Sequence, residues 1–293
     1  MDGVLIIDKP EGLTSHDVVA IARRTLGEKR IGHTGTLDPL ATGVLALACG
    51  RATRLVRFLT ASDKDYEATI RFGRATDTFD ITGEETARTD AEPAAAALEP
   101  AVAQLRGDYL QMPPAYSAKK VGGQRAYELA RRDEPVVLTP VPVSVTRAEV
   151  TSFTGATATV TLTCSAGFYV RTFAHELGQI LGTGACLEAL RRTRSGEFRL
   201  TEALTLDALQ QGVGDVDLIP LEQLLPGFPS VVVTDEGLTR VSHGRALEAS
   251  HFSVDSDRPD QPWVRILDGT GRLMALATRG NAPYSLHPSV VLT

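Results

Sequence analysis

Residues 32–43 read GHTGTLDPLATG, a run that contains three glycines, one proline, one histidine and one carboxylate. The glycines permit backbone angles that other residues avoid, and Pro39 restricts both its own φ angle and the conformation of Asp38. An apolar run follows at residues 44–49 and predicts a buried strand. The pattern predicts a rigid loop that presents Asp38 in one geometry at the mouth of that strand.

Asp38 has two interpretations at this position. A loop aspartate often accepts hydrogen bonds from its own backbone, and composition alone favours that role by about two to one. A carboxylate held on a rigid loop beside a buried strand is also well placed to act as a nucleophile. The other motifs of the chain decide between the two.

The composition is typical of a globular protein with room for two domains, since the 293 residues are 43% hydrophobic and 23% charged. No apolar run approaches the roughly 18 residues of a membrane span, and the N-terminus lacks the features of a signal peptide. Cys49, Cys164 and Cys186 are widely spaced, which argues against a disulfide framework or a zinc site. We therefore expect a cytoplasmic protein with no membrane or metal partner.

The net charge of −6 is unusual for a protein that binds nucleic acid, although a basic footprint can be local. Basic residues do cluster, within residues 23–30, 51–57, 131–132 and 191–194. Arginine accounts for 25 of the 30 basic residues and suits contacts to phosphates and bases. A genome-wide coding bias towards arginine explains the same count equally well.

Hydrophobic periodicity predicts a mixture of strands and helices over the first two thirds of the chain. Strands are expected at residues 4–7, 44–49, 66–72, 143–150 and 156–164. Helices are expected at residues 15–26, 53–59, 169–181, 187–192 and 205–210, the first capped by Ser15 and ended by Gly27. A peripheral helix should follow residues 85–97 and kink or restart at Pro100.

Residues 106–132 are broken by glycines and prolines, and their tyrosines alternate with cations. Tyr109, Tyr116 and Tyr127 lie among Lys119, Lys120 and Arg125. Aromatic and cationic side chains in this arrangement can stack on the bases of a single-stranded RNA loop. A surface hairpin with ordinary tyrosines is the alternative.

The composition shifts to proline, leucine and glycine at residues 219–229, which predicts a linker. Short strands are expected beyond it, at residues 231–233, 264–267, 273–277 and 290–292. This spacing predicts a small β-barrel at the C-terminal end.

No cofactor motif is present in the sequence. It contains no P-loop, G-x-G-x-x-G or G-x-S-x-G. His175 and Glu176 do not belong to a zinc motif, because H-E-x-x-H requires a histidine where the chain has Gln179. His175 is therefore expected to be structural. The clustered carboxylates or histidines that a metal-dependent RNA hydrolase needs are not apparent.

Several motifs together resemble the TruB family, the bacterial tRNA pseudouridine-55 synthases. The resemblance begins with GVLIIDKPEGLTS at residues 3–15 and GHTGTLDPLATGVL at residues 32–45. It continues through KDY at 64–66, RATDTFD at 74–80, GFYVRT at 167–172 and LRR at 190–192. These motifs occur in the family's order over most of residues 3–200.

The resemblance implies an α+β fold, the pseudouridine synthase fold, with a mixed, largely antiparallel sheet, flanking helices and a catalytic cleft. Residues 1–226 would be the catalytic domain. Within it, residues 106–132 would be a thumb-like RNA-binding insertion. Residues 227–293 would be a PUA-like RNA-binding domain.

The activity implied is the isomerisation of uridine to pseudouridine at position 55, in the T-arm loop of tRNA. The bond from ribose C1′ to N1 breaks and the uracil is rejoined through C5, so no atoms are gained or lost and no cofactor is required. The target base must be held outside the stack. The implied partner is the T-arm stem-loop of tRNA, and a monomer fits an enzyme that surrounds one RNA arm.

The resemblance also assigns roles to residues. Asp38 would be the nucleophile and attack either C1′ or the base. Burial alone raises the pKa of a carboxyl, so an ionised nucleophile needs a cation beside it, and Arg171 stands at the matching position. Tyr66 resembles the tyrosine that stacks on the flipped uracil, a position from which it could also handle the C5 proton. Tyr169 and Leu190 would line the same pocket.

His33 resembles the residue that enters the tRNA loop where the base has left. The sequence also admits two other functions. A guide-RNA-dependent rRNA pseudouridine synthase is disfavoured by the chain length and by the lack of long basic tails. A non-catalytic tRNA-folding chaperone is disfavoured because Asp38, Tyr66 and Arg171 occur together.

Overall fold

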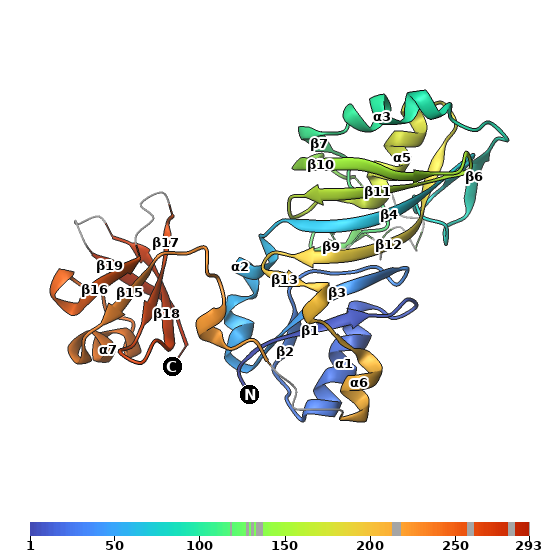
Figure 1. Ribbon diagram of the computed structural model, residues 1–293. Coiled ribbons are helices and arrows are strands. Elements are labelled where there is room, and N and C mark those ends of the chain that lie inside the picture. The colour runs from blue at the N-terminus through green and yellow to red at the C-terminus, as the bar shows by residue number, and fades with distance from the viewer. Residues whose placement is uncertain are drawn as a thin grey trace.

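The computed structural model describes residues 1–117, 119–126, 129, 132, 137–212, 218–256, 261–280 and 285–292. These residues form a ten-stranded sheet, a five-stranded sheet near the C-terminus and two small two-stranded sheets. Figure 1 shows the two larger sheets as separate bodies beside each other. Among the described residues, no helix is long and apolar enough to cross a bilayer.

The ten-stranded sheet is mixed and largely antiparallel, as predicted. Its main path, in spatial order, is β14 (Leu204–Thr205), β1 (Gly3–Lys9), β3 (Ala41–Cys49), β12 (Ala185–Ser195), β4 (Lys64–Phe72), β11 (Thr157–Cys164), β10 (Val141–Phe153) and β7 (Gly107–Gln111). Within the described part of this sheet, only β1 with β14 and β3 with β12 pair in parallel. The parallel β3–β12 pair lies in the middle of the sheet, and the Asp38 loop leads directly into β3.

The minor strands complete this part of the molecule. They are β2 (Ile31–His33), β5 (Arg74–Thr76), β6 (Glu85–Arg88), β8 (Lys120–Val121), β9 (Gln124–Arg125) and β13 (Phe198–Arg199). β2 pairs with β3 and β13 with β12, whereas β5–β6 and β8–β9 form the two-stranded sheets.

The helix predicted at residues 187–192 is wrong, because these residues belong to β12. This strand pairs with β4 along its whole length and with β3 at residues 190–192. Two β-bulges, between Leu187 and Ala189 and between Arg192 and Arg194, interrupt its two-residue alternation. The interrupted pattern resembles helical spacing, and only the neighbouring strands reveal that the segment is extended.

The helices pack in two groups, as Figure 1 shows. α1 (Ser15–Leu26) and α6 (Leu206–Gln211) lie near β1, and α3 (Ala95–Ala103) and α5 (Val170–Ile180) lie near β10 and β12. The helix expected at residues 53–59 is a 3-10 turn, Gly50–Leu55, followed by α2 (Val56–Thr60). α3 continues through Pro100, so the helix does not restart there.

The N-cap of α1 is Thr14 rather than Ser15. The Thr14 side chain accepts a hydrogen bond from the Asp17 amide, and Asp17 bonds back to Thr14 in a capping box. Ser15 is left free for a different contact and bonds the Leu37 backbone. Gly27 ends the helix in the left-handed conformation, as predicted.

The C-terminal sheet has the order β16 (Phe252–Ser256), β15 (Ser230–Val233), β17 (Trp263–Leu267), β18 (Leu273–Arg279) and β19 (Leu286–Val291). The four predicted strands fall largely within it. The sequence did not predict β16 or the helix α7 (Asp235–Ser242), which packs near β15 and β18.

The two larger sheets share a hydrophobic core. Leu273, Leu276 and Leu292 of the C-terminal part belong to the same buried cluster as Leu55 and Leu59. The predicted linker contributes as well, since residues 221, 224 and 225 are buried leucines of this cluster. Segment 219–229 is therefore a packed connection rather than a free linker.

Candidate active site

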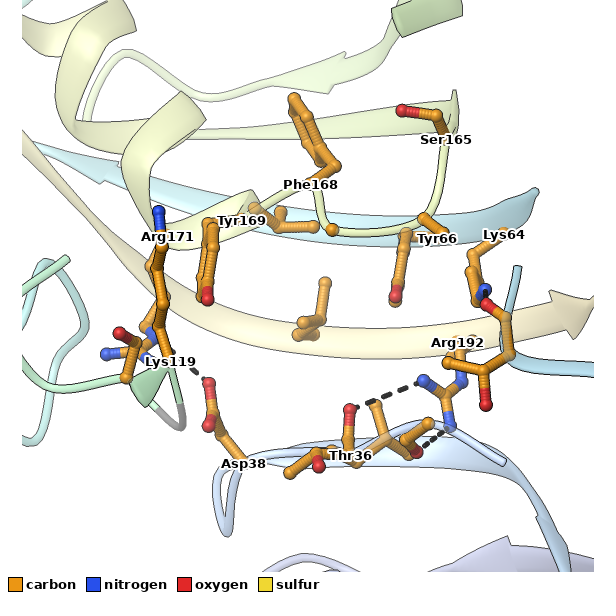
Figure 2. Close-up of a pocket in the computed structure, with 18 residues that line it drawn as sticks. Thr36, Asp38, Lys64, Tyr66, Lys119, Ser165, Phe168, Tyr169, Arg171 and Arg192 are labelled. Atoms are coloured by element: carbon orange, nitrogen blue, oxygen red, sulfur yellow. Dashed lines mark hydrogen bonds and ion pairs between the residues drawn. The ribbon is translucent and has the colours of Figure 1, made fainter. Parts of the chain in front are cut away.

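A cavity of about 400 Å³ opens between the Asp38 loop, β4, β12 and the start of α5. Five of the six predicted site residues line it: Asp38, Tyr66, Tyr169, Arg171 and Leu190. Figure 2 shows Asp38 on the loop on one side and the phenols of Tyr66 and Tyr169 opposite. Segments more than 100 residues apart in sequence are thus brought together around one space.

His33 lies outside the set of described residues that line the cavity. It ends β2, just before the Asp38 loop, and its ring packs edge-on against His16 with the centroids 5.3 Å apart. The histidine is therefore near the loop but not in the pocket.

Asp38 forms an ion pair with Arg171. The Nε atom of Arg171 lies 2.9 Å from Asp38 Oδ2. The two partners differ in exposure, since 7% of the Arg171 side chain is accessible compared with 42% of the Asp38 side chain. The cation is fixed in the protein, and the carboxylate keeps access to the cavity.

The remaining nitrogens of Arg171 are occupied by the backbone. Nη1 donates to the carbonyl of Thr78 at 3.0 Å, and Nη2 donates to the carbonyl of Tyr116 at 2.9 Å. A second carboxylate, Asp80, is buried with its Oδ2 3.7 Å from Nη1. Asp80 was missed from the sequence, although it lies within the RATDTFD motif that supported the family resemblance.

Tyr169 and Arg171 both reach the cavity although the segment between them changes conformation. Tyr169 is extended, with φ −110° and ψ 107°, and α5 begins at the next residue. Residues two positions apart point to the same face in an extended segment. The structure achieves the same result by starting a helix between the two residues.

Two buried cations hold the backbone of the Asp38 loop, and the sequence did not single out either; Arg192 also lines the cavity. Lys9 Nζ donates to the carbonyls of Pro39 at 3.3 Å and Ala41 at 2.7 Å. Arg192 donates to the carbonyls of Gly35 at 3.1 Å and Val44 at 2.7 Å. Buried loop carbonyls need donors, and charged donors give the stronger hydrogen bonds.

Ser15 and Gly43 complete the support of the loop. The Ser15 hydroxyl donates to the Leu37 carbonyl and accepts from the Leu37 amide, at 3.0 and 2.8 Å. Gly43 has φ +98°, and a Cβ there would lie 2.2 Å from the carbonyl oxygen of Arg192. Only glycine allows β3 to approach β12 this closely beside the cavity.

Burial changes the acid–base properties of the groups around the loop. It lowers the pKa of Lys9 to about 8, and it lowers the pKa of the cavity residue Lys64 to about 8 as well. Burial raises the pKa of Tyr66 and of Tyr169, so both phenols keep their protons at neutral pH. The cavity thus combines one paired carboxylate with two neutral aromatic rings and the apolar Leu190.

The chain is similar to known proteins over most of its length. Residues 23–170 match the family model described as TruB family pseudouridylate synthase (N terminal domain), and residues 171–225 match tRNA pseudouridylate synthase B C-terminal domain. A Solibacter usitatus protein named tRNA pseudouridine synthase B is 46% identical over 297 residues, which cover all of both chains. A Burkholderia mallei protein of the same name is 41% identical over 280 residues, 94% of this chain and 93% of the relative.

Solved structures agree on the fold. The crystal structure of the archaeal box H/ACA sRNP Nop10-Cbf5 complex contains a similar chain, with a TM-score of 0.76 at 24% identity. The match covers 99% of this chain and 86% of that one. At this identity the likeness establishes the fold alone.

Proposed function

The chain belongs to the TruB family of pseudouridine synthases, and we propose that it isomerises uridine 55 in the T-arm loop of tRNA, with Asp38 as the nucleophile. Isomerisation of uridine in tRNA follows from the family and from the names of the relatives. The position of the target uridine and the role of Asp38 are the finer part of the proposal.

The observation that carries the proposal is the ion pair between Asp38 and Arg171 at the wall of the cavity. The guanidinium holds the carboxylate through Oδ2, and the other carboxylate oxygen is available to attack. Attack at C1′ or at the base allows the C1′–N1 bond to break. The bond to Asp38 breaks as the C1′–C5 bond forms, C5 loses its proton and N1 gains one, so the formula of the nucleotide is unchanged and the carboxylate is regenerated.

The other cavity residues are proposed to hold the flipped base. A uracil that leaves the stack has to be received by flat or apolar surfaces. Tyr66, Tyr169 and Leu190 offer such surfaces, and the neutral phenols do not repel the developing negative charge on the base. His33, which lies outside the cavity, is proposed to enter the RNA loop in place of the base.

Two further segments are proposed to bind RNA. In the insertion 106–132, Ser117 and Lys119 line the cavity, which supports a role next to the target nucleotide. Tyr127 and Arg131 of this insertion lie outside the described residues. Residues 227–293 are proposed to be a PUA-like RNA-binding domain, with the catalytic domain in residues 1–226. The proposed partner is one T-arm stem-loop, bound by a monomer in the cytoplasm.

A guide-dependent rRNA synthase is the main alternative. The archaeal complex shares the fold at 24% identity, whereas the relatives at 41–46% identity are named tRNA pseudouridine synthase B. The higher identity supports a tRNA substrate recognised without a guide RNA.

The test is release of tritium from a tRNA transcript labelled at C5 of its uridines. We expect one equivalent of tritium per tRNA, and no release from a transcript in which position 55 is cytidine. No release from either transcript would overturn the proposal and favour a non-catalytic chaperone. Equal release from both transcripts would overturn the assignment of position 55.

A further inference from the structure

Gln111, the last residue of β7, contacts the backbone of Tyr169 at two points. Its Oε1 accepts from the Tyr169 amide at 2.8 Å, and its Nε2 donates to the Tyr169 carbonyl at 3.1 Å. The side chain is fully buried, with 0% of its surface accessible. The partners fix the orientation of the amide, because a backbone N–H can only donate and a carbonyl can only accept.

This contact takes the place of a helix cap. Tyr169 is the N-cap of α5 and makes no side-chain capping bond of its own. The first amides of a helix have no partner within the helix and need one from outside. Gln111 supplies a partner for the amide of the N-cap residue itself, and so it holds Tyr169 at the position where the extended segment becomes α5.

The start of α5 lies between two residues that line the cavity. Tyr169 is the last extended residue, and Arg171 is the second residue of the helix. Any shift in the start of the helix rotates the Arg171 side chain about the helix axis and moves its Nε away from Asp38. A neighbouring contact supports the same alignment, since the Thr172 hydroxyl donates to the Met112 carbonyl at 3.2 Å.

We propose that Gln111 is a positioning residue that aligns Tyr169 and Arg171 for the reaction through these two backbone hydrogen bonds. Gln111 touches no reacting atom and acts through the residues it aligns. It also belongs to the insertion 106–132, so it links the first strand of that insertion to the chemistry. The inference rests on the proposed function, because the alignment matters only if the cavity is catalytic.

The first test compares Gln111→Met with Gln104→Met. Methionine keeps the length of glutamine but has no amide, and Gln104 is an exposed glutamine seven residues earlier. We expect Gln111→Met to lower the single-turnover rate at saturating enzyme by roughly ten- to a hundredfold, because small misplacements near the reacting atoms have effects of this order. The dissociation constant for tRNA should change less than about threefold, since binding spreads over a large interface. Gln104→Met should match the wild type in both.

Hydrogen exchange measures the bond between the Tyr169 amide and Gln111 directly and does not depend on activity. The Tyr169 amide should lose protection in Gln111→Met, whereas the Leu181 amide, which bonds the Leu177 carbonyl at the other end of α5, should keep it. Unchanged protection of Tyr169, or a wild-type rate in a variant that has lost that protection, would overturn the inference. If the wild type itself releases no tritium, the proposed function fails, and the exchange result still decides whether the contact exists.

A second variant keeps the inference testable if Gln111→Met does not fold. In Gln111→Glu an ionised carboxylate can accept from the Tyr169 amide but cannot donate to its carbonyl, and a protonated carboxyl can do both. The titratable groups around the contact are Tyr109 on β7, Tyr169, and Arg171 and Glu176 on α5. All of them are also present in the wild type, so the ratio of the two rates removes their direct effect on the wild-type rate and leaves the effect of the carboxyl at position 111. The ratio of variant to wild-type rate should rise as the pH falls, and a ratio independent of pH would overturn the inference.

Discussion

The Nε atom of Arg171 lies 2.9 Å from Asp38 Oδ2, while both Nη atoms of the same guanidinium donate to backbone carbonyls. Those carbonyls belong to Thr78 and Tyr116, so the plane of the guanidinium is fixed by the main chain. The main chain thus fixes the guanidinium of Arg171, and the guanidinium in turn orients the Asp38 carboxylate.

Arg171→Lys should lower kcat/KM by about a hundredfold, because an ammonium cannot reproduce a planar fork that contacts three groups at once. The measurement is tritium release from tRNA under steady-state conditions. Arg147→Lys is the matched control, since Arg147 is an exposed residue of β10 that pairs with Glu149. A lysine variant as active as the wild type would show that activity does not depend on the pairing of Arg171 with Asp38.

Lys9 should make stability depend on pH. Burial lowers its pKa to about 8 in the folded protein, whereas an exposed lysine of the unfolded chain titrates near about 10.4. Between these values the unfolded state binds more protons, so the free energy of unfolding rises with pH, by up to about 1.4 kcal/mol per pH unit. The stability of the wild type relative to Lys9→Met should rise in the same way.

Urea unfolding of both proteins at pH 7, 8, 9 and 10 measures this difference. Other groups titrate equally in the two proteins and cancel. A difference that stays constant over the range would show that the folded protein does not lower the pKa of Lys9.

The insertion 106–132 should respond to RNA in two parts. Gln111, Met112 and Tyr116 hydrogen-bond to Tyr169, Thr172 and Arg171, and these bonds do not involve RNA. We expect the amides of β7, which is held by these bonds and pairs with β10, to be protected from hydrogen exchange with or without a T-arm stem-loop. The β8–β9 hairpin, which makes only a two-stranded sheet, should gain protection when the stem-loop binds. Equal protection of the hairpin in both states would count against a thumb that closes over RNA.

Removing residues 228–293 should destabilise the remaining chain as well as weaken RNA binding. Phe58 loses the ring of Trp263, whose centroid lies 4.8 Å away, and also the ring of Phe228. Leu55 and Leu59 lose the leucines of β18 that share their cluster. Thermal unfolding followed by circular dichroism should show a lower midpoint. A truncated protein with the midpoint of the full chain would mean that the shared core contributes little.

The sequence predicted those parts of the molecule whose signals are local. β4 was recognised because apolar and polar residues alternate along it. Its apolar residues Ala68, Ile70 and Phe72 are all buried. α1 was recognised because its apolar spacing and the glycine that ends it lie within thirteen residues. The cavity residues were found because their motifs resemble a family, and the structure brings five of them around one space.

The parts that were missed depend on contacts between distant residues. β12 was assigned to a helix because its bulges hide the alternation, and only β3 and β4 define it as a strand. Lys9 and Arg192 look like ordinary charged residues until their partners, 32 and 148 residues away, are known. Asp80 is a second carboxylate beside Arg171 only because α5 brings the guanidinium to it.

The central claim is that the carboxylate of Asp38 is the nucleophile. Asn has nearly the same shape as Asp but cannot act as a carboxylate nucleophile, so Asp38→Asn should abolish turnover and leave tRNA affinity within about tenfold of the wild type. The most direct measurement is tritium release by Asp38→Asn under multiple-turnover conditions, with tRNA affinity measured on the same preparation. The account predicts intact binding with no release, and sustained multiple turnover by Asp38→Asn would contradict it.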